Sequence, residues 1–205
     1  MAETLIADAL TTVQRVKDRL ALAVASTGFD SVFLRLISAA SEFIKHECGV
    51  ASFKEATYSQ EKYSFDRATD KLFLKNIPAT AVATLYYNVG SLGTPSWTAY
   101  ASDDWSFDID SGIITLQGTF PIGQKTVAVT YTAGYKIDFA NFGSATHTLP
   151  ADLTELCERL AVRWFKRREA EGKTAESMNG GSITWDKDIT SEDKAILTMY
   201  KRILF

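Results

Sequence analysis

Two histidines and two cysteines are the residues of this sequence best suited to nucleophilic or acid–base chemistry. A nucleophile needs a base within hydrogen-bond reach. His46 precedes Cys48 by two residues in a helical pattern, so the two side chains point to different faces. His147 lies in a polar loop, and Cys157 lies in another helical pattern. We therefore expect structural or solvated histidines, buried free thiols and no enzymatic activity.

Two loops superficially resemble binding motifs. Asp108-Ile-Asp110-Ser-Gly112 is similar to part of a calcium loop, but its glycine falls one position early and no glutamate follows at the twelfth position. In Gly118-Thr-Phe-Pro-Ile-Gly123-Gln-Lys125, Gln124 separates the second glycine from the lysine that a phosphate loop requires. We predict a hairpin turn and a β-turn at these places, and no metal or other cofactor.

Four basic residues recur at spacings of three and four in a helical pattern, which places Arg159, Arg163, Lys166 and Arg167 on one broad side. They could form a solvated face paired with Glu155, Glu158 and Glu169, an interface of salt bridges between subunits, or a DNA contact. The net charge of −3 and the pI of about 5.5 disfavour a protein that grips nucleic acid by its phosphates. We predict that they form a subunit interface.

The elements that position these residues begin with two helices. Thr11 or Thr12 can cap a helix whose apolar stripe contains Val13, Val16 and Leu20. Asp30 is the expected N-cap of a second helix, and Gly49 its expected stop. The apolar face of the second helix contains Phe33, Leu36, Ile37, Ala40, Ile44 and Cys48.

The periodicity changes after Gly49, because β-branched and aromatic residues become frequent and Gly, Asp and Asn separate short runs. Eight strands are predicted: Phe53–Tyr58, Lys62–Phe65, Lys71–Leu74, Val82–Asn88, Trp97–Ala99, Trp105–Ile109, Ile113–Leu116 and Thr126–Thr132. A helical pattern returns after Pro150 and is expected to end at Gly172. An extended piece, Ser182–Trp185, precedes a last helix from Glu192 to Ile203, which Ser191 is expected to cap.

Together these elements predict an α+β fold, a small helical bundle with a β-sheet-rich insertion. The expected divisions are N-terminal helices in 1–49, the β-rich insertion in 50–136, and C-terminal helices with a docking tail in 149–205. The apolar stripe of each helix must be covered by another helix, so the terminal helices should close over one another. No run approaches the length needed to span a bilayer, so we expect no membrane partner.

The order of these segments resembles the head–tail adaptor (connector) proteins of long-tailed bacteriophages. Five stretches carry the resemblance in sequence order: the Leu10–Leu20 segment, Leu34–Ile44, Leu72-Phe-Leu-Lys-Asn-Ile-Pro78, Val129-Thr-Tyr-Thr-Ala-Gly-Tyr135 and Leu149-Pro-Ala-Asp-Leu153. The tail, with Ser182-Ile-Thr-Trp185 and Tyr200-Lys-Arg202, is also similar. The β-rich block is longer than in the smallest members, and the chain extends before Leu10.

The resemblance implies a structural protein of the virion neck, assembled in the host cytoplasm. It implies a homo-oligomeric ring, commonly dodecameric, that binds the portal protein and a downstream stopper or tail protein. DNA would pass through the ring without specific binding, which suits a mildly acidic chain. In this family the C-terminal segment tends to engage the portal, which here points to Met199, Tyr200, Ile203, Leu204 and Phe205. The last helix could instead pack within its own bundle.

Two alternatives remain open from the sequence. The first is another neck or tail-completion protein, such as a stopper or terminator. The second is a β-rich ligand-binding module that reads sugars with Trp97 and Trp105. Tryptophans in such positions can equally be core anchors.

Overall fold

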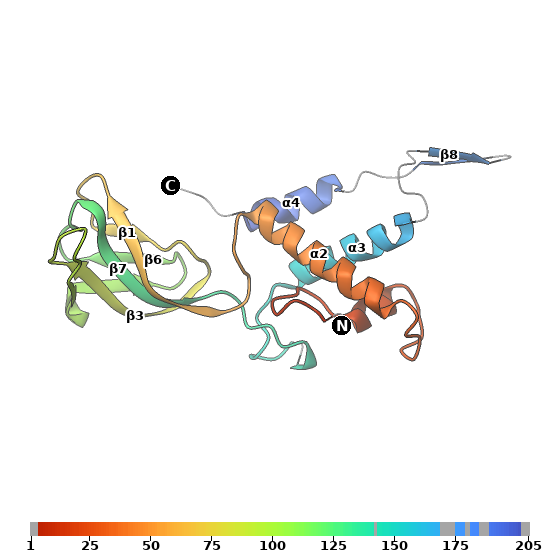
Figure 1. Cartoon of the computed structure of the whole chain (residues 1–205), viewed down its shortest axis with the longest axis horizontal. Helices are drawn as coiled ribbons and strands as arrows, with labels where there is room; N and C mark the ends of the chain where they lie inside the picture. Colours follow the sequence, from red (N-terminus) through yellow and green to blue (C-terminus); the bar gives the residue numbers. More distant parts are fainter. Residues whose placement is uncertain (1–3, 142, 169–174, 179–180, 185–188, 202–205) are drawn as a thin grey trace. The chain divides into compact units, whose positions relative to one another are not determined.

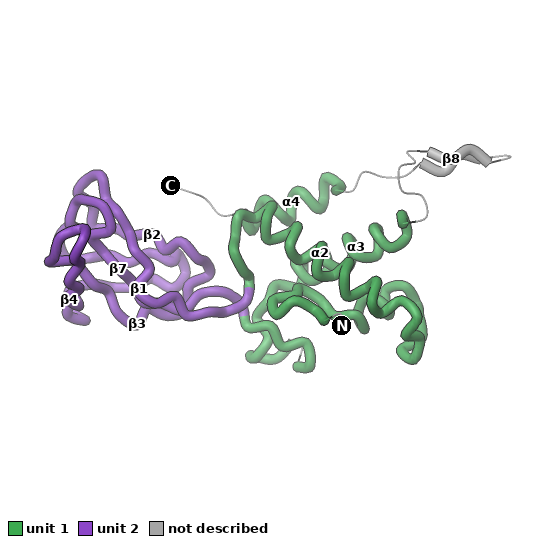
Figure 2. Tube along the Cα trace, in the orientation of Figure 1, with its two compact units in different colours: residues 1–53, 136–205 green, residues 54–135 purple. Residues whose placement is uncertain are grey.

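The computed structural model describes residues 4–141, 143–168, 175–178, 181–184 and 189–201. The fold is α+β, and the chain forms two compact units (Figure 2). Unit 1 comprises residues 1–53 and 136–205 and carries the described α-helices, while unit 2 comprises residues 54–135 and is built mainly of strands. A β-rich insertion therefore interrupts a helical unit, as the change of periodicity predicted. None of the described helices combines the length and hydropathy required to cross a membrane.

Unit 1 is organised around two helices that lie side by side, α2 (Asp30–Cys48) and α3 (Ala151–Arg167), with α1 (Val13–Arg19) and α4 (Ser191–Met199) packed against them (Figure 1). The apolar stripe of α2 is buried as its spacing predicted, except that Leu36 is half-buried. The apolar stripe of α3 provides Leu153, Leu156 and Leu160, which are completely buried. Burial of the two stripes supplies the main apolar stabilisation of this unit.

The helix boundaries correct several sequence predictions. Thr12 caps α1 and Gly49 ends α2 in the left-handed conformation, with φ of 68°, as predicted. Asp30 is not the N-cap of α2. Phe29 occupies that position, and the Asp30 carboxylate binds the buried Lys17 ammonium at 2.6 Å.

The last helix also begins and ends differently from its prediction. Thr190, not Ser191, caps α4, in a reciprocal capping box with Asp193. The helix ends at Met199, before the predicted Ile203. Gly172, the predicted end of α3, and Ile203 lie outside the described residues. Two short strands, β8 (Ala175–Met178) and β9 (Gly181–Thr184), pair antiparallel between α3 and α4 in the sequence.

Unit 2 contains two antiparallel sheets. The first has the order β1-β7-β3-β4, formed by Ala56–Phe65, Gly123–Ala133, Ala79–Asn88 and Trp97–Ala99. The second has the order β2-β6-β5, formed by Lys71–Phe73, Ile113–Leu116 and Trp105–Asp108. Side chains from both sheets form one apolar core, which includes Leu72, Leu85, Ile114, Val127, Val129 and Tyr131.

Strand β1 replaces the two strands predicted at Phe53–Tyr58 and Lys62–Phe65. The strand continues through an irregularity between Tyr58 and Glu61, where the register against β7 shifts and Gln60 has a positive φ of 47°. A bulge of this kind breaks the alternation of inward and outward side chains, which is why the pattern suggested a gap.

A polar network crosses the core of unit 2. The Tyr131 hydroxyl donates to Glu61 Oε2 at 2.6 Å and accepts from Asn76 Nδ2 at 2.8 Å and from the Asn76 backbone N–H at 3.2 Å. The Tyr63 hydroxyl also donates to Glu61, at 2.7 Å. Burial and the hydrogen bond to Glu61 raise the pKa of Tyr131 to about 12. The network ties the connection after β2 to strands β1 and β7.

The first and last residues of unit 2 are adjacent. The Glu55 backbone N–H donates to Tyr135 O at 2.8 Å, and Lys54 pairs with Tyr135 in a parallel bridge. Gly134 has a φ of 106°, and a Cβ at this position would lie 2.7 Å from the Lys54 carbonyl carbon. The chain therefore turns closely against itself here, and glycine is required for that approach.

Both loops that superficially resemble binding motifs are turns, as predicted. Asp108 Oδ1 accepts from the Asp110 N–H at 3.1 Å in the hairpin between β5 and β6, and Gly112 follows with φ of 68°. After Gly118, strand β7 begins at Gly123 where a phosphate loop would begin a helix.

Candidate functional site on helix α3

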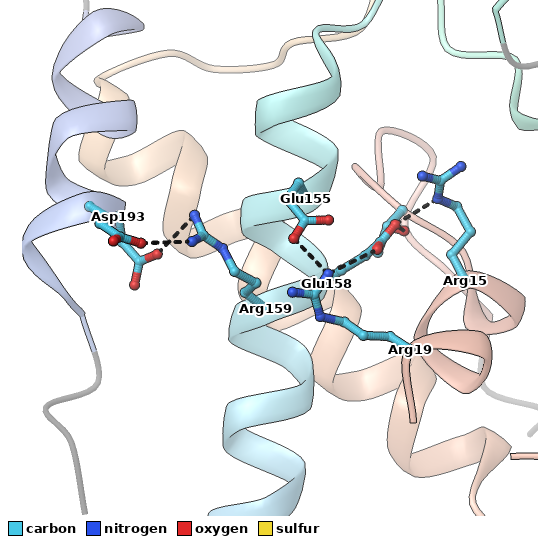
Figure 3. A network of polar contacts seen from close by, with 8 residues as sticks. Arg15, Arg19, Glu155, Glu158, Arg159 and Asp193 are labelled. Carbon is cyan, nitrogen blue, oxygen red and sulfur yellow. Dashed lines mark hydrogen bonds and ion pairs between the residues drawn. The ribbon is translucent and has the colours of Figure 1, made fainter. Parts of the chain in front are cut away.

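Helix α3 has acidic side chains that face one neighbouring helix and basic side chains that face another. Glu155 and Glu158 are three residues apart, and Arg159 and Arg163 are four apart, so each pair shares a face. The glutamates face α1 and the arginines face α4 (Figure 3). Helix α3 therefore holds both peripheral helices of unit 1 by ion pairs, in addition to their contacts with α2.

The contact between α3 and α1 centres on Glu158, whose side chain is 7% exposed. Its Oε1 accepts from Arg15 Nε at 2.6 Å and from the Thr11 hydroxyl at 3.0 Å. Arg19 Nη1 binds Glu155 at 2.6 Å and lies 3.8 Å from Glu158 Oε2. Hydrogen bonds from the Arg15 guanidinium and the Thr11 hydroxyl satisfy this buried carboxylate, whose burial would otherwise be costly.

The contact between α3 and α4 centres on Asp193, whose side chain is completely buried. Arg163 Nη1 donates to Oδ2 at 2.9 Å, and Arg159 Nη2 lies 3.2 Å from Oδ1. The Thr190 backbone N–H also donates to Oδ2, at 3.0 Å. Burial alone raises the pKa of Asp193, but hydrogen bonds from Thr190 and Arg163 outweigh it and hold the pKa below its ordinary value. Asp193 is therefore a carboxylate at neutral pH.

Few apolar contacts hold α4. Within this helix the buried side chains are Asp193 and Leu197. The Cys48 thiol donates to Leu197 O at 3.7 Å, and the Tyr200 hydroxyl donates to Asp152 at 2.7 and 2.8 Å. The attachment of α4 thus depends largely on charged and hydrogen-bonding groups.

The four basic residues predicted at a subunit interface have different surroundings in the structure. Arg159 and Arg163 bind Asp193 of the same chain. Lys166 is exposed in the last turn of α3, and Arg167 is half-buried there. Glu158 and Glu155 bind Arg15 and Arg19 of α1, and Glu169 lies outside the described residues.

Two of the five residues predicted to engage the portal can be placed. Met199 is 74% exposed at the end of α4, and Tyr200 is half-buried against Asp152. Ile203, Leu204 and Phe205 lie outside the described residues. Asp193 was missed by the sequence reasoning, although Thr190 and Asp193 have the spacing of a capping box.

The histidines and cysteines have the surroundings predicted for them. His46 is exposed, with 88% of its side chain accessible, while His147 is buried and its Nδ1 accepts from the Asp138 N–H at 3.0 Å. Cys48 and Cys157 are buried free thiols. Burial raises the pKa of Cys48 to about 11 and that of Cys157 to about 12. Among the described residues, no group of three or more His, Cys, Asp or Glu side chains is arranged to hold a metal ion.

The two tryptophans considered for sugar binding differ in their surroundings. Trp105 packs against the core of unit 2, and its Nε1 is buried, with no hydrogen-bond partner among the described residues. Trp97 begins β4, is half-buried, and has Lys62 Nζ 6.0 Å from its ring centroid. Trp105 is thus a core anchor, as the alternative to sugar binding proposed.

One comparison with known proteins identifies a family, and another identifies a similar fold. Residues 9–203 match the family described as head completion protein, so the match covers both units. Among solved structures, the chain is similar to one described as "Neck of empty GTA particle computed with C6 symmetry". That likeness has a TM-score of 0.58 at 18% sequence identity and covers 98% of this chain and 94% of the other. No curated protein matches the sequence.

Proposed function

This chain belongs to the head completion protein family, and from that membership we propose that it forms a ring below the portal of a tailed phage. As a head completion protein it has a structural role in the neck of the particle. The proposed ring lengthens the DNA channel and connects the portal to a stopper or tail protein. The observation that carries the proposal is the family match over residues 9–203, which includes residues of both units.

The C-terminal segment is proposed as the portal-docking element. Support comes from α4, where Asp193 and Leu197 face the body of unit 1 while Met199 is 74% exposed. Tyr200 is fixed by Asp152, so the chain beyond it starts from a defined position. Met199, Tyr200, Ile203, Leu204 and Phe205 would provide the apolar anchors.

Lys166 and Arg167 remain candidates for contacts between subunits, together with the exposed parts of Arg159 and Arg163. The arginine side chains are 21% and 20% exposed and bind Asp193, so their first role is within the chain. A further salt bridge to a neighbouring subunit would therefore extend the existing network.

Electron microscopy of the protein mixed with its portal tests the proposal. A ring stacked on the narrow end of the portal is the expected result, and the absence of any association under assembly conditions contradicts it. A chain truncated after Lys201 tests the docking segment, because it keeps α4 and the Tyr200–Asp152 contact. We expect this truncation to abolish portal binding while thermal stability stays close to that of the full chain. A Lys194→Glu variant, which changes an exposed residue of α4, serves as the control.

A further inference from the structure

The charged residues of unit 2 are segregated along the chain. Lys and Arg occur at Lys54, Lys62, Arg67, Lys71, Lys75 and Lys125. No Lys or Arg occurs between Asn76 and Gln124, although this stretch contains Asp103, Asp104, Asp108 and Asp110. The four aspartates are exposed, and none of them forms an ion pair with another residue of the described chain.

The fold places the two kinds of charge at opposite edges of one sheet. In the three-stranded sheet, β6 lies between β2 and β5. We call Arg67, Lys71 and Lys75, on and beside β2, the basic edge. We call Asp103, Asp104, Asp108 and Asp110, on and beside β5, the acidic edge. Two strand spacings, roughly 10 Å, separate the two edge strands.

Each edge also exposes one large apolar side chain. Phe73 on β2 is 47% exposed, and Ile109 in the turn after β5 is 57% exposed. The carboxylates Asp66 and Asp70 lie next to Arg67 and Lys71 in the sequence, so the three cations of the basic edge exceed the neighbouring anions by one charge. Lys75 is partly engaged, since its Nζ donates to Lys62 O at 2.7 Å, whereas Arg67 and Lys71 are exposed.

We propose that the acidic edge of one copy of this chain binds the basic edge of the next copy. A ring with cyclic symmetry requires a heterologous interface, in which two different surfaces of each subunit meet. The two edges are different, opposite in charge and located on opposite sides of the same sheet. Charge complementarity therefore selects a second copy as the partner, with Ile109 and Phe73 as the apolar groups buried at the contact. This contact rests on the proposed ring.

Two charge-reversal variants test the contact. Asp103→Lys, Asp104→Lys and Asp110→Lys together give a subunit with two basic edges, with Asp108 kept because it accepts hydrogen bonds within the turn. Arg67→Glu with Lys71→Glu gives a subunit with two acidic edges. Each variant alone should form about tenfold fewer rings on the portal than the wild type, because like charges then meet at every contact. An equimolar mixture should restore the rings, with the two variants alternating. Native mass spectrometry counts the copies of each variant.

Lys62→Glu with Lys125→Glu is the matched control for Arg67→Glu with Lys71→Glu, because it makes the same change in net charge on the four-stranded sheet. This control should form rings as the wild type does. Thermal unfolding reports whether each variant folds. Should a reversal prevent folding, the neutral pairs D103N/D104N and R67Q/K71Q replace it, with a smaller loss expected from each.

The outcomes separate this contact from the proposed function. Wild-type rings together with unimpaired rings of both variants would overturn the contact and leave the function standing. Folded variants that each fail, and whose mixture also fails, overturn the contact too, because the partner of these edges is then another molecule. Failure of the wild type itself to form a ring on the portal overturns both.

Discussion

Arg163 and Asp193 lie 30 residues apart in the sequence, yet Arg163 Nη1 donates to Asp193 Oδ2 at 2.9 Å. Arg159 approaches the other oxygen of the same carboxylate at 3.2 Å. Asp193 is one of the two buried side chains of α4, so this carboxylate attaches the helix to α3. The proposed docking segment therefore comes directly after a helix that two arginines hold in place.

Replacing Asp193 should detach α4 while the rest of unit 1 stays folded. Asp193→Ala leaves two arginines facing a buried cavity without their anion, so we expect a loss of about 2–4 kcal/mol in the free energy of unfolding. Urea unfolding measures the loss, and hydrogen exchange should locate it in α4. Glu192→Gln is the control. Glu192 is 81% exposed and 3.5 Å from Arg159, so its change should cost less than about 1 kcal/mol. Equal effects of the two variants would contradict the role given to Asp193.

The attachment of α4 should depend on pH in the acid range. The pKa of Asp193 is lower in the folded chain than in the unfolded chain, so its stabilising contribution is fully present above the unfolded value, near 3.8. The contribution is lost as pH falls below that value through the folded pKa. We expect hydrogen-exchange protection of α4 to be constant from pH 7 to about 5 and to fall below about 4. Loss of protection already at pH 6 would require another titrating group.

Both thiols should react slowly with alkylating reagents. The thiolate is the reactive form, and pKa values of about 11 for Cys48 and about 12 for Cys157 leave both groups protonated at pH 8. Iodoacetamide labelling followed by mass spectrometry should find little modification of the native protein and complete modification in denaturant. Cys48 should be the faster of the two in the Asp193→Ala variant, because α4 covers it through Leu197.

The close approach at Gly134 should make unit 2 sensitive to a single methyl group. Gly134→Ala places a Cβ 2.7 Å from backbone atoms of Lys54 and forces a positive φ, so we expect a loss above about 3 kcal/mol. Gly118→Ala separates the two causes. Gly118 has a φ of 119° with nothing within 4 Å of its added Cβ, so conformational strain of about 1–3 kcal/mol is expected alone. Thermal unfolding of both variants gives the comparison.

The tyrosine network should stabilise unit 2 through its hydrogen bonds. Tyr131→Phe removes the hydroxyl that binds Glu61 and Asn76, so we expect a loss of about 1–3 kcal/mol from buried groups left without a partner. Tyr58→Phe is the control, because Tyr58 stacks on Tyr131 with ring centroids 5.2 Å apart. A loss for Tyr58→Phe as large as that for Tyr131→Phe would contradict the role given to the network, because Tyr58→Phe leaves both the network and the stacked rings in place.

Local patterns predicted the elements better than their ends. Spacings of three and four found α2 and α3, and alternation found β7. The cap of α4 was misplaced by one residue, although Thr190 and Asp193 carry the spacing of a capping box. Strand β1 was divided at Gln60, because a bulge interrupts the alternation that defines a strand in sequence.

Long-range pairs were beyond the sequence reasoning. Neighbours within a helix suggested that Arg159 and Arg163 would pair with glutamates of α3. The structure instead joins them to Asp193 and joins Glu158 to Arg15 and Thr11. Charge and spacing within one helix do not reveal which other helix will supply the counter-ion. That information lies in the packing of α1 and α4 on α3.

The hydrogen bond from Glu55 to Tyr135 has a consequence for how the protein can vary. For the folding of the helical unit, the whole insertion is equivalent to a short loop, because its first and last residues lie next to each other. Lengthening, shortening or exchanging it between Lys54 and Tyr135 adds little loop-closure entropy to the helical unit. The length and sequence of the insertion can therefore change while the fold of the helical unit stays the same.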